Sequence, residues 1–104
     1  MTPPSSDDPA QSGAVTRILK IINEKGLHAR ASAKFVATVE KFKDGAKVKV
    51  SRGEETVSGD SIMGLMMLGA GIGSSITVSA TGREALAAVD ALDKLVSGKF
   101  GEDE

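Results

Sequence analysis

Residues 46–51 read AKVKVS, a strict alternation of apolar and polar side chains. Successive side chains of a β-strand point to opposite faces, so the alternation predicts a strand with one buried face and one face in water. The turn residues Arg52 and Gly53 follow, and a second short strand is expected around TVS at residues 56–58. Such a half-buried hairpin is typical of a sheet that is covered on one side only.

Helical patterns flank the hairpin on both sides. A first helix is expected over residues 29–42. Its apolar stripe consists of Ala29, Ala33, Val36 and Val39, with Phe35 and Phe42 close beside it. A shorter helix is expected over residues 61–68, with Ser61 as its N-cap and glycines at 69, 71 and 73 ending it.

A last helix is expected to begin at a capping box formed by Thr81 and Glu84 and to end at Gly98. Its apolar positions are Leu86, Val89, Leu92 and Val96. Two further strands are predicted at residues 15–22 and 75–80, the first of them apolar enough that its buried face stays undecided. The order β-α-β-β-α-β-α predicts an α+β open-faced β-sandwich. In this fold a four-stranded antiparallel sheet carries three helices on one face.

The chain is expected to hold one small domain between two tails. Residues 1–13 contain all three prolines with serine and aspartate, a composition that favours a flexible N-terminal tail. The domain itself is assigned to residues 14–98. Residues 99–104 end in GEDE and are predicted to form an acidic C-terminal tail that frays into solvent.

Composition narrows the classes of function. The 104 residues include 13 basic and 14 acidic side chains, a formal net charge of -1, and only three aromatic residues. That balance offers neither a basic surface nor a stacking platform for nucleic acid. Cysteine is absent, and no apolar stretch approaches the roughly 18 residues that span a membrane. We therefore expect a cytoplasmic protein with no nucleic-acid partner and no membrane insertion.

The single histidine, His28, directly precedes the first predicted helix. Unpaired backbone N–H groups and the positive end of the helix dipole converge at such a position, which therefore suits a phosphate group. Arg30 stands two residues further on and can supply forked donors to phosphate oxygens. By themselves, these features also fit an ordinary capping or surface histidine.

The longer segment GLHARASAKFV at residues 26–36 closely resembles the active-site segment of the HPr family, the histidine-containing phosphocarriers of the bacterial phosphotransferase system. The resemblance implies that His28 is phosphorylated at Nδ1, assisted by Arg30. It implies Enzyme I, charged by phosphoenolpyruvate, as donor and an EIIA-type protein as acceptor. It also implies a carrier rather than an enzyme, with no metal and no cofactor. We expect a monomer.

One position departs from the family pattern. Where the family usually has proline directly after the active-site arginine, this chain has Ala31. Alanine is a good helix former, so the helix should persist without the proline. Alanine here is expected of the nitrogen-type branch, NPr, which serves regulatory phosphotransfer rather than sugar uptake.

A second segment, SIMGLMMLG at residues 61–69, resembles the family's regulatory serine motif. It implies phosphorylation of Ser61, with HPr kinase/phosphorylase as the partner, although a plain helix cap would also explain a serine at this position. The resemblance further implies Ile62, Met63 and Met66 as docking residues, since methionine suits a surface that fits several partners. The alternative is that these side chains fill the core.

Two other functions are alternatives to the phosphocarrier. A purely regulatory binding module on the same fold would be read through Ser61, but the presence of His28 and Arg30 counts against it. A small-ligand sensor would need a convergent polar pocket, which the sequence does not indicate. The glycine-rich stretch at residues 69–73 lacks the Lys-Ser/Thr pair of a P-loop.

Overall fold

The computed structural model describes residues 14–102. The expected N-terminal tail and the last two residues of the expected C-terminal tail lie outside the described residues. Within them the chain forms seven main elements and a final short turn. These are β1 (Val15–Lys20), α2 (Ala29–Glu40), β2 (Lys47–Arg52), β3 (Glu55–Ser58), α3 (Ile62–Met67), β4 (Ser75–Thr81), α4 (Ala85–Ser97) and η1 (Lys99–Gly101).

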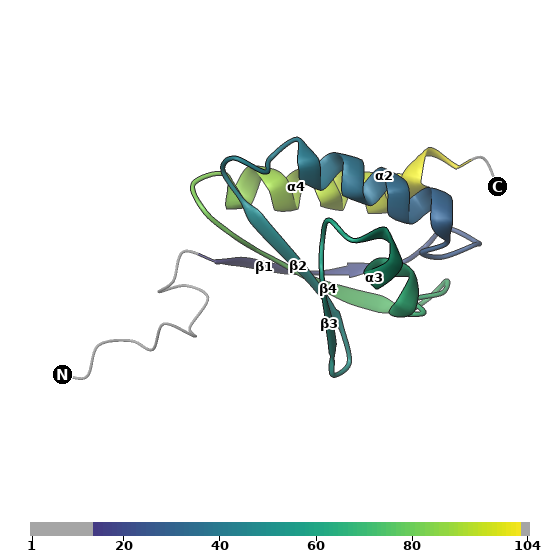
Figure 1. The fold of residues 1–104 in the computed structure, drawn as a ribbon. Coiled ribbons are helices and arrows are strands. Elements are labelled where there is room, and N and C mark those ends of the chain that lie inside the picture. The colour runs from purple at the N-terminus through teal and green to yellow at the C-terminus, as the bar shows by residue number, and fades with distance from the viewer. Residues whose placement is uncertain (1–13, 103–104) are drawn as a thin grey trace.

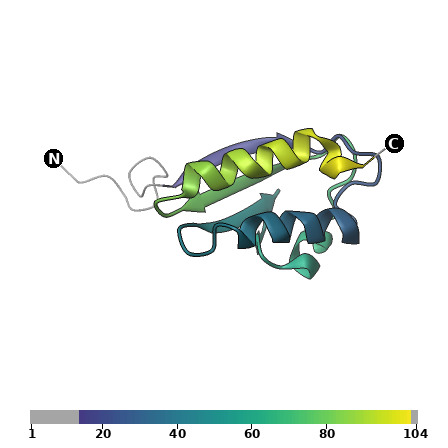
Figure 2. The same ribbon diagram turned by 90° about the horizontal axis from the view of Figure 1, so that it is seen from above.

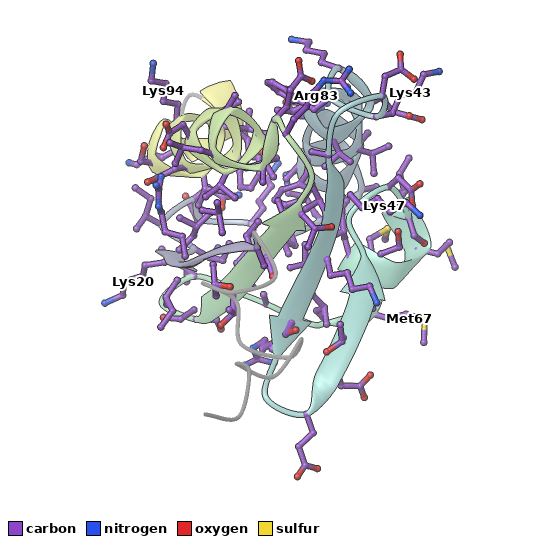
Figure 3. The ribbon with its side chains drawn as sticks, turned by 90° about the vertical axis from the view of Figure 1, so that its left-hand side faces the viewer. Lys20, Lys43, Lys47, Met67, Arg83 and Lys94 are labelled. Carbon is purple, nitrogen blue, oxygen red and sulfur yellow. The ribbon has the colours of Figure 1, made fainter. Side chains whose placement is uncertain are left out.

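The four strands form one antiparallel sheet in the order β1-β4-β2-β3. α2 and α4 lie side by side over one face of this sheet (Figures 1 and 2), and α3 packs against α2 and β3. Among residues 14–102, no helix covers the opposite face (Figure 3). The predicted open-faced α+β sandwich is therefore confirmed, and Val48 and Val50 are buried between exposed lysines as their alternation indicated.

The register of β1 decides which of its two faces is buried. Val15, Arg17 and Leu19 stand opposite the inward-facing residues of β4. Leu19 is buried under the helices, whereas Ile18 points to the open face and is exposed. A strand with apolar residues on both sides is thus resolved by its neighbour, because a shift of one residue would exchange the two faces.

The buried face of α2 differs from the predicted stripe. Ala29 and Ala33 are exposed. The buried positions are Ala31, Ser32, Phe35 and Val39. Positions 31, 35 and 39 are one helical turn apart and form a stripe of their own. Phe35 has the larger apolar surface to bury, so the helix rotates to place this ring in the core.

The start of α4 also differs from the prediction. Thr81 is the last residue of β4, and Glu84 precedes the helix without a side-chain capping bond, so no capping box forms. Instead the Glu84 backbone N–H donates to Gly45 O at 2.8 Å. Leu86 is 56% exposed. The buried face of α4 consists of Ala85, Ala88, Val89, Leu92 and Val96.

The C-terminal segment is packed rather than frayed over residues 98–102. Gly98 ends α4 as predicted, but the chain then turns back and buries Phe100, which is only 1% exposed. The expectation that solvent surrounds this segment is wrong for residues 98–102, because the aromatic ring of Phe100 precedes the acidic residues and packs into the core. Burying that ring offsets the entropy of ordering the chain end.

Candidate functional site at the start of α2

His28 is the N-cap residue of α2, as the sequence predicted. Its backbone is extended, its carbonyl accepts from the Ser32 N–H at 2.9 Å, and its side chain makes no capping bond to the helix. The imidazole is 27% exposed. The ring therefore stands at the surface beside the first unpaired N–H groups of the helix, where an anionic group would be stabilised.

The loop before His28 is held by backbone contacts from a distant part of the chain. The Leu27 N–H donates to Ala70 O at 2.9 Å, and the hydroxyl of the buried Ser32 donates to Leu27 O at 3.2 Å. Gly26 has a φ of 64°, and a Cβ there would lie 2.4 Å from Ala70 O. Glycine is thus required for the close approach that fixes the histidine. The glycine-rich stretch at residues 69–73 thus supports the loop before His28 through the carbonyl of Ala70, a structural role that needs no P-loop.

A carboxylate faces the ring of His28. Glu102 Oε2 is in hydrogen-bond contact with His28 Nε2, and Glu102 Oε1 accepts from Asn23 Nδ2 at 3.0 Å. The hydrogen bond from His28 lowers the pKa of Glu102 below its ordinary value of 4.5, and the hydrogen bond from Asn23 adds to this effect. Neither residue was predicted from the sequence, since only the folded chain end brings position 102 to position 28.

Arg30 lies in the first turn of α2 and is exposed. Among residues 14–102 it makes no hydrogen bond or ion pair, with His28 or with any other side chain. Its guanidinium is therefore available to an incoming group, but no contact in the structure tests its predicted role.

Ser61 is the N-cap of α3, as predicted. Its Oγ accepts from the Gly64 backbone N–H at 3.0 Å. A Cβ at Gly64 would lie 3.0 Å from the Cβ of Val57, so this glycine lets the helix approach β3. The serine predicted to be regulatory is half-buried and has an ordinary capping bond.

The apolar side chains of α3 divide between core and surface. Leu65 and the neighbouring Leu68 are buried, whereas Met63 is 69% exposed. The other exposed apolar residues of α3 are Ile62, Met66 and Met67. Met67, which was not among the predicted docking residues, points away from the body of the protein (Figure 3). We call these four exposed residues the α3 patch.

Neither of two hollows on the surface of residues 14–102 is lined by His28. A hollow of about 360 Å³ lies instead between the end of α2 and β2, lined by residues that include Val39, Lys43 and Lys47. Within residues 14–102, no group of three histidine, cysteine, aspartate or glutamate side chains could hold a metal ion. None of the described helices is long and apolar enough to cross a membrane. A surface histidine and an exposed apolar patch on two helices that pack together suit a protein partner better than a small molecule.

Comparison with known proteins agrees with this geometry. Residues 15–98 match the family model described as the PTS HPr component phosphorylation site. The chain is 49% identical to the phosphocarrier protein HPr of Cupriavidus necator over 84 residues, 81% of this chain and 92% of the relative. It is 41% identical to the phosphocarrier protein NPr of Shewanella violacea, covering 83% of this chain and 92% of the relative.

A crystal structure of HPr from Thermoanaerobacter tengcongensis superposes with a TM-score of 0.80 at 38% identity, covering 86% of this chain and 99% of that one. Fold and site together define a small phosphocarrier with one surface histidine. The chain belongs to the HPr family of the phosphotransferase system.

Proposed function

We propose that this phosphocarrier accepts a phosphoryl group on His28 from Enzyme I and passes it to an EIIA-type protein. The observation that carries the proposal is the position of His28. The only histidine of the chain stands at the surface, at the N-terminus of a twelve-residue helix. Backbone N–H groups of that helix can stabilise the oxygens of the transferred group, and the exposed Arg30 can add a positive charge.

The transfer itself needs no acid or base from the carrier. A lone pair of the His28 ring, at Nδ1 as the family resemblance implies, forms a bond to phosphorus. The bond between phosphorus and the donor breaks, and its electron pair leaves with the donor. Catalysis then consists mainly of positioning and charge stabilisation, which the braced loop before α2 supports.

The α3 patch supports docking of protein partners. Its methionines are exposed on a helix that packs against α2, so a partner resting on them would lie over the same side of the molecule. Flexible, polarisable methionines can fit a donor and an acceptor of different shape in turn. Ile62, Met63 and Met66 thus remain the proposed docking residues, and we add Met67.

Ser61 is proposed as a regulatory phosphorylation site that HPr kinase/phosphorylase modifies. Its position directly before the α3 patch supports this role, because a phosphate there would place about -1.5 to -2 charges beside the docking surface. The capping bond to Gly64 explains the serine structurally as well, so labelling must separate the two roles.

Ala31 supports a nitrogen-type, regulatory phosphotransfer chain. Its side chain is fully buried in the first turn of α2, where the family usually places proline. Relatives named HPr and NPr both match the chain, so sugar uptake and regulation are separated by the acceptor rather than by the carrier's fold. We further propose a cytoplasmic monomer.

The decisive experiment is incubation with phosphoenolpyruvate and Enzyme I, followed by intact-mass spectrometry. We expect one acid-labile phosphoryl group on the wild type and none on His28→Ala. Arg30→Ala should label about 10–100-fold more slowly if the guanidinium stabilises transferring charge. Arg83→Ala is the matched control, because it removes an exposed arginine just before the start of α4, and this variant should label normally. An unlabelled wild type would favour the regulatory binding module instead.

A further inference from the structure

The chain end next to His28 has an unusual backbone. Lys99 and Phe100 both have a φ of 57°, and Gly101 follows at 73°. Non-glycine residues rarely adopt this left-handed conformation, and two in succession are rarer still. Strain of this kind persists only where surrounding contacts over-determine it, and such positions are frequent at functional sites.

The turn is anchored by the core and by α2. Phe100 is buried, and its carbonyl accepts from Lys34 Nζ at 2.6 Å. Backbone bonds close the turn on itself, from Gly101 N to Gly98 O at 3.0 Å and from Glu102 N to Lys99 O at 2.9 Å. In Figures 1 and 2 the yellow chain end lies beside the blue start of α2. The turn therefore delivers residue 102 to the N-terminus of that helix.

Glu102 is fixed there by a second residue. Asn23 is fully buried, and its Nδ2 group donates one bond to Gly26 O at 2.9 Å and one to Glu102 Oε1 at 3.0 Å. Both acceptors require N–H donors, so the amide orientation is determined. The Glu102 side chain is only 11% exposed, and its second oxygen faces His28 Nε2. Both carboxylate oxygens of Glu102 are therefore held in contact with defined partners.

We propose that Glu102 is a positioning residue for phosphoryl transfer, acting through the His28 tautomer. A carboxylate accepts but does not donate, so Nε2 must carry the proton in this contact. The neutral ring then presents its lone pair at Nδ1. When Nδ1 bonds to phosphorus, the Nε2 proton stays in place, and the positive charge that develops on the ring faces Glu102. This inference rests on the function proposed above.

Nitrogen-15 NMR of histidine-labelled protein tests the tautomer without any transfer reaction. The single histidine yields one pair of ring signals, recorded at about pH 8.5, where imidazole is ordinarily neutral. Wild type should show a proton on Nε2. In Glu102→Gln the single amide oxygen should stay on Asn23 Nδ2, so the NH2 group faces the ring and should move the proton to Nδ1. Glu102→Ala should show a mixture of tautomers. Glu54→Gln, at the exposed tip of the β2–β3 hairpin, is the charge-matched control and should resemble wild type.

Labelling rates with phosphoenolpyruvate and Enzyme I test the consequence. Glu102→Ala should label about tenfold more slowly, and Glu102→Gln should show no rescue, because its NH2 group facing Nε2 places the ring proton on Nδ1, where the lone pair is needed. A wild-type tautomer in Glu102→Ala would overturn the proposal. So would equal or faster labelling of that variant, which would make the carboxylate a barrier to the anionic phosphoryl group. If wild type shows the expected tautomer yet takes no label, the proposed function has failed and the transfer role of Glu102 falls with it.

Discussion

Truncation of Phe100 tests the packing of the C-terminal segment. The ring is 1% exposed although it stands close to the end of a 104-residue chain. Replacing a buried phenylalanine by alanine removes apolar contacts and leaves a cavity, which costs about 3–5 kcal/mol. Domains of this size are stable by only about 5–15 kcal/mol. Phe100→Ala should therefore remove a large share of the free energy of unfolding.

The structure places the loss near the lower end of that range. Residues 99–102 can detach from the core after the truncation, so the cost is limited to what their docking contributes. Alanine retains a Cβ, so the left-handed backbone at this position gains no relief of strain. We expect a loss of about 3 kcal/mol, which corresponds to a fall in melting temperature of about 12–24 °C for a domain of this length.

Urea unfolding, followed by far-ultraviolet circular dichroism, measures the effect through the transition midpoint. Leu86→Ala is the control, because this leucine is 56% exposed on α4 and its truncation should change stability by no more than about 0.5 kcal/mol. An equal, small effect for both variants would refute the reasoning. It would mean that residues 99–102 lie in solvent, as the acidic composition of the chain end suggests.

Three further predictions concern the site. Met63→Glu should slow phosphoryl exchange about 10-fold or more with little loss of stability, because the new charge must be desolvated on docking. The control Leu86→Glu should exchange normally. Unfolding of Met63→Glu would assign this methionine to the core. Ser61→Asp should keep or slightly raise the melting temperature while slowing His28 labelling, and the inhibition should weaken at higher salt. Equal labelling rates for wild type, Ser61→Ala and Ser61→Asp would mean that Ser61 serves only as a helix cap. The lowered pKa of Glu102 means that its contribution to stability is complete above roughly pH 5 and is lost as the pH falls through the folded-state value. The stability difference between wild type and Glu102→Gln should accordingly shrink from pH 7 to pH 3. A difference independent of pH would contradict the lowered pKa of Glu102.

Local sequence patterns predicted the elements of this fold well. The alternation at residues 46–51, the N-cap position of Ser61 and the end of α4 at Gly98 all depend on neighbours within a few residues. The same holds for His28, whose place before α2 follows from the turn and the helix pattern around it. Such features are local, so a short window of sequence contains the information that determines them.

The misjudged faces show where local patterns fail. Alanine is small enough to be buried or exposed, so the positions of Ala29 and Ala33 did not indicate which side of α2 packs on the sheet. Phe35 decided the rotation only once the sheet and α4 were in place. Likewise, β1 is apolar on both sides, and its register with β4 alone assigns Leu19 to the core and Ile18 to the open face.

By itself, the sequence determined the element order, the open-faced class, and a lone histidine at a helix start. Only the tertiary structure decided what surrounds that histidine. Ala70 reaches Leu27 across 43 positions, and Glu102 reaches His28 across 74. Contacts at such separations form only when the sheet and helices close the chain into one core. Residues 99–102 then fold back toward His28 because Phe100 is buried in that core.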